Sequence, residues 1–188
     1  VAKGSLKSVY LTEEVAQSRR IAPDDQFLQN MEEWRLRLAQ SMVKNDQSIS
    51  SGQLTSATLL LLNQIIFIKM LTDRGIEDEY LDLLLKQISD EPGQSIYSQF
   101  GPVLQRLDKF YNGGIFKKRR EIESAVVSPD LLRELIHSFG AERSLYSFAA
   151  MPIEIIGNAY ERFLGKVIEV KGAKVSAEDR REVRRSKG

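Results

Sequence analysis

Two clusters of basic residues are the feature of this sequence that could do chemistry, because lysine and arginine side chains neutralise phosphates. The first cluster is Lys117, Lys118, Arg119 and Arg120. The second, near the C-terminus, is Arg180, Arg181, Arg184, Arg185 and Lys187. Both could give salt-sensitive, sequence-independent contacts to a nucleic acid backbone. The alternative interpretation is solvated surface, since acidic residues flank or interrupt both clusters.

Residues that could support catalysis within this chain are scarce. His137 is the single histidine and there is no cysteine, which excludes a histidine-based metal site, cysteine-ligated zinc and thiolate chemistry. Acidic pairs such as Glu32 and Glu33 are neighbours on a helix and point in different directions, so they do not converge on a metal. No glycine-rich phosphate-binding motif is present. We therefore expect no catalytic, cofactor-binding or metal-binding residue in this chain.

Composition and charge indicate one globular domain of ordinary size. The chain has 188 residues and a formal net charge of +1, so an interaction with nucleic acid must come from local patches of charge. The first residues lack the apolar core of a signal peptide. The apolar stretch Leu54–Leu71 is interrupted by polar residues, which favours a central core helix over a membrane span. We expect no membrane partner.

Helical periodicity dominates the chain. Apolar residues recur every three or four positions from Pro23 to Val43, and further helices are predicted over about 53–73, 78–88 and 97–111. Ser128 and Pro129 are typical of a helix start, and that helix should end near Phe139. Pro152 should open a long amphipathic helix over Ile153–Val170. Only short pieces around Val9–Leu11 and around Val126 and Val127 hint at strand.

The predicted fold class is all-α: an irregular bundle of about six helices with a long C-terminal amphipathic helix and a basic tail. We expect residues 1–22 to be an N-terminal extension or linker. Residues 23–172 should form the helical domain, and residues 173–188 a charged linker.

Four segments, in this order and spacing, resemble the helical region that precedes the adenine-specific methyltransferase domain in single-chain (Type IIG) restriction–modification enzymes. They are Phe27–Met42, Leu62–Ile76, Asn112–Lys118 with the helix after it, and Ile156–Lys166. The last segment reads IGNAYERFLGK and is similar to the family's Gly-x-x-Tyr-Glu signature. Type I modification subunits share this helix and are the nearest relatives of the family.

This resemblance implies that the chain is a helical connector between nuclease and methyltransferase modules, and inactive alone. The run Arg184–Gly188 resembles the approach to a Gly-x-Tyr-Tyr-Thr-Pro-like motif that would follow it. S-adenosylmethionine and magnesium are implied for the parent protein only. The expected partners are DNA and the methyltransferase domain of the same polypeptide, in the cytoplasm of a bacterium or archaeon. Residues expected to pack against that domain are Tyr160, Glu161, Phe163 and Leu164.

Two other classes of function stay open on the residues alone. One is an independent helical module that binds nucleic acid through the two basic clusters. The other is a helical protein–protein interaction domain whose last helix docks a partner through Tyr160 and Phe163.

Overall fold

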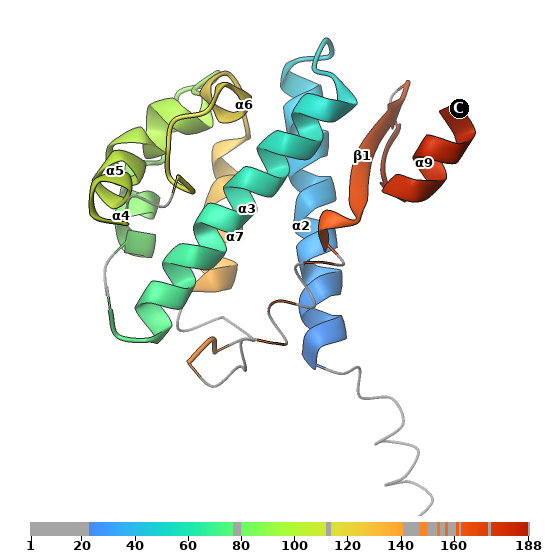
Figure 1. Cartoon of the computed structure of the whole chain (residues 1–188). Coiled ribbons are helices and arrows are strands. Elements are labelled where there is room, and N and C mark those ends of the chain that lie inside the picture. Colours follow the sequence, from blue (N-terminus) through green and yellow to red (C-terminus); the bar gives the residue numbers. More distant parts are fainter. Residues whose placement is uncertain are drawn as a thin grey trace, which may run out of the picture.

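The computed structural model describes residues 23–76, 80–111, 114–140, 147–149, 154, 157, 161, 163–172 and 174–187. Within these ranges the chain is mostly helical, with one two-stranded sheet (Figure 1). The predicted all-α bundle is therefore confirmed in outline. The possible strand at Val9–Leu11 lies outside the described residues.

Two long helices form the centre of the fold and pack on each other. They are α2 (Pro23–Asn45) and α3 (Ser51–Asp73). A reciprocal capping box opens α3: the Ser50 hydroxyl accepts from the Gln53 amide at 3.3 Å, and the Gln53 side-chain oxygen accepts from the Ser50 amide at 2.9 Å. By length and composition alone α3 could cross a membrane, but 61% of its apolar window is buried inside the molecule, as in a core helix.

Four shorter helices pack around α3, and Figure 1 shows α4, α5 and α6 together on one side of it. They are α4 (Tyr80–Gln87), α5 (Ile96–Tyr111), α6 (Arg120–Glu123) and α7 (Pro129–Phe139). The helix α5 continues through Pro102, in agreement with the helix predicted over about 97–111. The predicted start of α7 is confirmed, although the Ser128 side chain makes no cap hydrogen bond; its backbone N–H instead donates to Ser41 Oγ at 3.0 Å.

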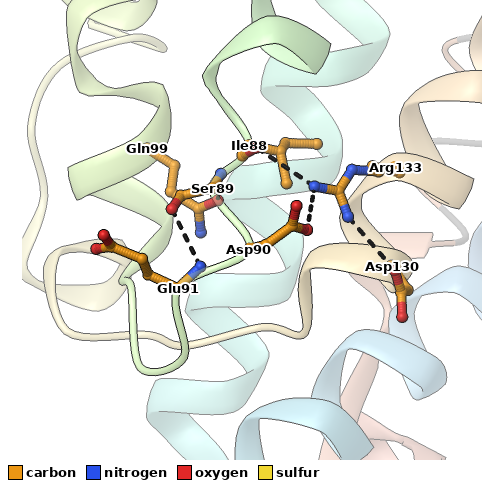
Figure 2. Close-up of polar contacts among 7 residues, drawn as sticks. All are labelled: Ile88, Ser89, Asp90, Glu91, Gln99, Asp130 and Arg133. Carbon is orange, nitrogen blue, oxygen red and sulfur yellow. Dashed lines mark hydrogen bonds and ion pairs between the residues drawn. The ribbon is translucent and has the colours of Figure 1, made fainter.

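An arginine on α7 joins that helix to the loop between α4 and α5 (Figure 2). The guanidinium of Arg133 donates to Asp90 at 2.5 Å, to the Ile88 carbonyl at 3.4 Å and to Asp130 at 3.4 Å. In the same loop the Ser89 amide donates to the buried side chain of Gln99 at 3.2 Å. These contacts fix the loop to two helices. A single antiparallel bridge between Ser95 and Val126 is the structure's counterpart of the strand hint at Val126.

The predicted helix over Ile153–Val170 is wrong in its C-terminal part. Helical geometry reaches Leu164, and the chain then turns at Gly165 into β1 (Lys166–Lys171). The physical reason is local: Val167, Ile168 and Val170 are β-branched and favour extended backbone. Gly172, at a φ of 62°, supplies the turn that a hairpin needs. These strand and turn preferences outweigh the helical spacing of the apolar residues.

The second strand, β2 (Lys174–Asp179), pairs antiparallel with β1 and leads directly into α9 (Arg180–Lys187). Ile168 lies opposite Ala177 and Val170 opposite Val175, and this face of the hairpin packs on the helical core. The hairpin therefore spans the predicted domain boundary at residue 172. The boundaries themselves stay predictions. Residues 174–187, expected as a linker, have regular secondary structure.

Candidate nucleic-acid interface and hairpin joint

The first basic cluster lies on the loop before α6 and on the first residue of that helix. All four side chains are exposed, but two are engaged. Lys118 forms an ion pair with Glu123 at 2.7 Å and lies 4.7 Å from the Tyr97 ring centroid; the hydrogen bond to Glu123 raises the pKa of Lys118. Arg119 donates to the Gly114 carbonyl at 3.4 Å. Lys117 and Arg120 are thus the better-placed members for an external phosphate.

Arg120 also borders a small pocket of about 110 Å³ between the α2–α3 loop and α6. Its lining mixes apolar side chains such as Met42 and Ile49 with polar ones, including the carboxylate of Asp46. The pKa of Asp46 is lowered by hydrogen bonds from Ser48. A carboxylate in the lining makes this pocket a poor site for an anion, so we assign the pocket no ligand.

The second basic cluster lies on α9. Arg180, Arg181 and Arg185 are exposed, and Arg184 and Lys187 belong to the same helix. The Asp179 carboxylate accepts from the Arg181 amide at 2.7 Å and so caps the start of this helix. Figure 1 shows α6 and α9 on opposite sides of α3, so the two clusters form separate surfaces.

A further basic pair lies at the tip of the hairpin and was missed by sequence reasoning. Lys171 and Lys174 are directly opposite each other in the ladder, and both are exposed. The missed signal was a turn of the form Lys-Gly-Ala-Lys directly after a segment rich in β-branched residues.

The hairpin is joined to α2 by a buried arginine. Arg35 is only 1% exposed; its Nη1 donates to the Phe163 carbonyl at 3.1 Å, and its guanidinium carbon lies 4.7 Å from the Phe163 ring centroid. Among the described residues, Nε and Nη2 have no hydrogen-bond partner. Burial, then the charge of Arg180, lowers the pKa of Arg35 to about 10, and Glu32 only partly opposes this shift. The joint therefore holds a desolvated charge against an aromatic ring.

Side chains of α2 and α3 complete the joint. Glu32 on α2 forms an ion pair with Lys166, the first residue of β1. On α3, the Thr55 hydroxyl accepts from the Ile168 amide at 2.8 Å and the Ser51 hydroxyl accepts from the Val170 amide at 3.2 Å. Two side chains from the first helical turns of α3 thus accept hydrogen bonds from amides on the edge of β1 that does not face β2. The hairpin cannot slide along α3 without losing both bonds.

The residues predicted to pack against another domain differ in how exposed their side chains are. Phe163 is 2% exposed and packs inside this chain against Arg35, Leu164 is half-buried and Glu161 is exposed. Tyr160 lies outside the described residues. Interdomain packing by this group stays a prediction, and Phe163 is already engaged within the chain.

The described part of the chain contains no group of three or more His, Cys, Asp or Glu side chains that could hold a metal ion. His137 lies exposed near the end of α7. The most buried ion pair is Lys69 with Asp73 at 2.6 Å, and the other Asp73 oxygen accepts from the Phe148 amide at 2.8 Å. This pair holds residues 147–149 against α3, which is a structural role.

The comparison with known proteins points to restriction–modification enzymes. The chain is 28% identical over 151 residues to the Type II restriction enzyme and methyltransferase RM.Eco57I of Escherichia coli. The alignment covers 80% of this chain and 14% of the relative's length. No family model matches the chain, and no solved structure does. The chain is thus related to a restriction–modification enzyme, in agreement with the class of protein that the sequence resembles.

Proposed function

We propose that this chain is the helical connector of a single-chain restriction–modification enzyme, a spacer that holds a nuclease module and a methyltransferase module in fixed geometry. The observation that carries the proposal is the relation to RM.Eco57I across 80% of the chain. The chain spans 14% of that protein's length, so the connector would be one part of a larger machine.

The packing of the chain supports a stiff spacer. Each of the two central helices has 23 residues, a length of about 35 Å at 1.5 Å per residue. Buried apolar side chains such as Leu38, Leu61 and Ile68 each contribute on the order of 1.5–3 kcal/mol. Because Arg35, Thr55 and Ser51 bind the hairpin to these helices, α9 is carried on the same body. An element attached to α9 would therefore keep its orientation relative to α2.

The methyltransferase domain is the proposed partner in the same polypeptide. Of the residues predicted to pack against that domain, Glu161 and Leu164 are the described ones with accessible side chains: Glu161 is exposed and Leu164 is half-buried. In this proposal S-adenosylmethionine and magnesium are held by other domains of the parent protein. The donor set of the described residues does not fit a metal site, and we assign no step of methyl transfer or cleavage to this chain.

DNA is the second proposed partner, bound through its phosphates. Exposed basic side chains on the first cluster and on α9 support this part of the proposal, most clearly Lys117, Arg120, Arg181 and Arg185. Such contacts would position the parent enzyme on the duplex without reading its sequence. An independent nucleic-acid-binding module would use the same residues, and would bind DNA without any catalytic partner.

Incubation of the purified chain with plasmid DNA and radiolabelled S-adenosylmethionine tests whether it is inactive alone. We expect no incorporation above a reaction without protein. Robust methylation by the 188-residue chain would overturn the connector proposal.

The rigidity of the spacer can be measured by electron paramagnetic resonance, because the chain has no cysteine of its own. Spin labels at Gln105→Cys on α5 and Glu182→Cys on α9 sit at exposed positions on opposite sides of the joint. One narrow distance distribution is expected. A broad or bimodal distribution in the otherwise wild-type chain would contradict a fixed spacer, and Arg35→Ala in the same background should broaden it.

A further inference from the structure

The tip of the β1–β2 hairpin places two like charges face to face. Lys171 and Lys174 are paired in the ladder register, where Cβ atoms are about 4.5–5.5 Å apart and like charges are destabilising. Both side chains are exposed, and Gly172 takes a positive φ between them. The repulsion between the two charges costs local stability. A pair of this kind is suited to an anionic partner.

Acidic side chains on the same two strands, Glu178 first and then Glu169, neutralise this pair only in part. Glu178 accepts from Lys171 at 2.9 Å and also from the Ser176 hydroxyl at 3.1 Å. The ion pair is exposed and so is worth little in water. No ion pair to Lys174 is formed among the described residues. One positive charge at the tip is therefore uncompensated, and the other is easily released.

Positive charge is concentrated in this end of the chain. Residues 163–188 contain eight Lys and Arg against four Asp and Glu, a net charge of +4. Since the whole chain carries +1, the remaining residues carry −3. The near-neutral total thus hides a strong separation of charge, which can orient the molecule on a polyanion.

The helix α9 carries further arginines next to the hairpin. It begins directly after β2 and packs on that strand. In Figure 1 the C-terminal end of α9 and the free end of the hairpin point the same way. The start of α9 lies at the other end of the hairpin, where the Arg180 amide donates to the Gly165 carbonyl at 2.9 Å. Arg181 and Arg185 are exposed on this helix. The hairpin tip and the C-terminal end of α9 are therefore two separate basic elements at the same end of the hairpin.

We propose that this surface, made of Lys171, Lys174 and Arg185 and called the tip surface below, binds the phosphate backbone of duplex DNA. The inference rests on the proposed function only in naming DNA as the partner. Residues 164–188 contain no aromatic side chain, so the surface offers no stacking platform for the unpaired bases of a single strand. Lysine and arginine without base-stacking groups match a contact to phosphates alone.

The test measures binding of the full 188-residue chain to a fluorescent 30-base-pair duplex of arbitrary sequence, by anisotropy from 50 to 200 mM salt. The variant is Lys171→Gln/Lys174→Gln. Each phosphate contact contributes about 0.9 to the slope of log K against log salt, so losing two lowers the slope's magnitude by about 1.8. If this electrostatic contribution is taken as zero at 1 M salt, the loss of one phosphate contact weakens binding at 50 mM salt by about fifteen-fold.

A matched control removes the same total charge elsewhere. Lys86→Gln/Lys109→Gln replaces two exposed lysines on α4 and α5, on the far side of α3 from the hairpin. We expect its salt slope to equal that of the wild type. The melting temperature of the tip variant should be unchanged or slightly raised, because repulsion across the ladder is relieved. This readout separates lost binding from a damaged hairpin.

The possible outcomes separate the inference from the wider proposal. Equal binding by wild type and tip variant would overturn the inference while leaving DNA contact through the Lys117–Arg120 cluster intact. Equal weakening by both double variants would also overturn it, because net charge alone would then explain binding. Tighter binding to a single strand than to the duplex would contradict the stated partner. No duplex binding by the wild type at 50 mM salt would sink the inference, whereas the methylation test of the connector would be unaffected.

Discussion

The guanidinium of Arg35 on α2 contacts both the backbone and the side chain of Phe163, because it donates to the Phe163 carbonyl and lies over the Phe163 ring. The two residues are 128 positions apart in the sequence. One buried side chain thus ties the first long helix to the turn that starts the hairpin. This contact helps to set the orientation of the hairpin and of α9.

Substitution of Arg35 should destabilise the chain according to the volume that is lost. Arg35→Ala leaves the Phe163 carbonyl unpaired and a cavity beside its ring, and should lower the free energy of unfolding by about 2–4 kcal/mol. Arg35→Met keeps the volume and removes the unpaired charged N–H groups, so its cost should be below about 1.5 kcal/mol. Urea denaturation of both variants tests this. Equal losses would mean that the charge, and not the packing, stabilises the joint.

The hydroxyl of Thr55 should matter for the hairpin and little for the helices. Thr55→Val keeps the shape but leaves the Ile168 amide without its acceptor, at a cost of about 1–2 kcal/mol. Hydrogen exchange should speed up in β1 and β2 and stay unchanged in α7. Ser56→Ala, at the exposed neighbouring position, is the control and should leave exchange in the hairpin as it is in the wild type. Faster exchange throughout the chain in Thr55→Val would contradict a local role.

The sequence predicts those features of the fold that are determined by neighbouring residues, and not those that depend on contacts between distant parts of the chain. The starts of α3 and α7 could be predicted because Ser50 with Gln53 and Ser128 with Pro129 act within one helical turn. On α2 the structure leaves the apolar Trp34 half-buried and buries the charged Arg35 beside it. Burial of that charge requires Phe163, which no local pattern brings near.

The hairpin was missed for a different reason, since its signal was local but ambiguous. Phe163, Val167 and Val170 fit a helical stripe, while the same stretch is rich in β-branched residues between Gly165 and Gly172. The pairing of β1 with β2, and the support from Thr55 and Ser51, decide the conflict in favour of strand. Because the hairpin was not predicted, part of the candidate site was missed as well. The α9 arginines could be named from the sequence, but Lys171 and Lys174 could not be placed beside them.

The buried ion pair on α3 should be costly to break from one side. Lys69→Met leaves the carboxylate of Asp73, which is 10% exposed, without its cation and should destabilise the chain by about 3–5 kcal/mol. The double variant Lys69→Met/Asp73→Asn removes that charge but keeps an oxygen that can accept from the Phe148 amide. It should be more stable than Lys69→Met alone. Thermal unfolding at pH 7 distinguishes the two, and a double variant less stable than the single one would contradict this account.

The ion pair between Arg37 and Glu134 should give a small loss of stability in acid. Two hydrogen bonds, at 2.7 and 2.5 Å, join α2 to α7, and they hold the pKa of Glu134 below its ordinary value of 4.5. Because the folded-state pKa is depressed, the stabilisation is fully present above pH 4.5 and is lost as the pH falls through the folded-state value.

At pH 7 the wild type should exceed Glu134→Gln in free energy of unfolding by less than about 1 kcal/mol, since the pair is exposed to solvent. This gap should close as the pH is lowered below 4.5. Glu182→Gln on α9 is the matched control, because Glu182 is exposed and makes no ion pair among the described residues. Urea denaturation between pH 7 and pH 3 measures the gap. A gap that stays constant across this range would show that Glu134 stabilises the chain through contacts that do not depend on its charge.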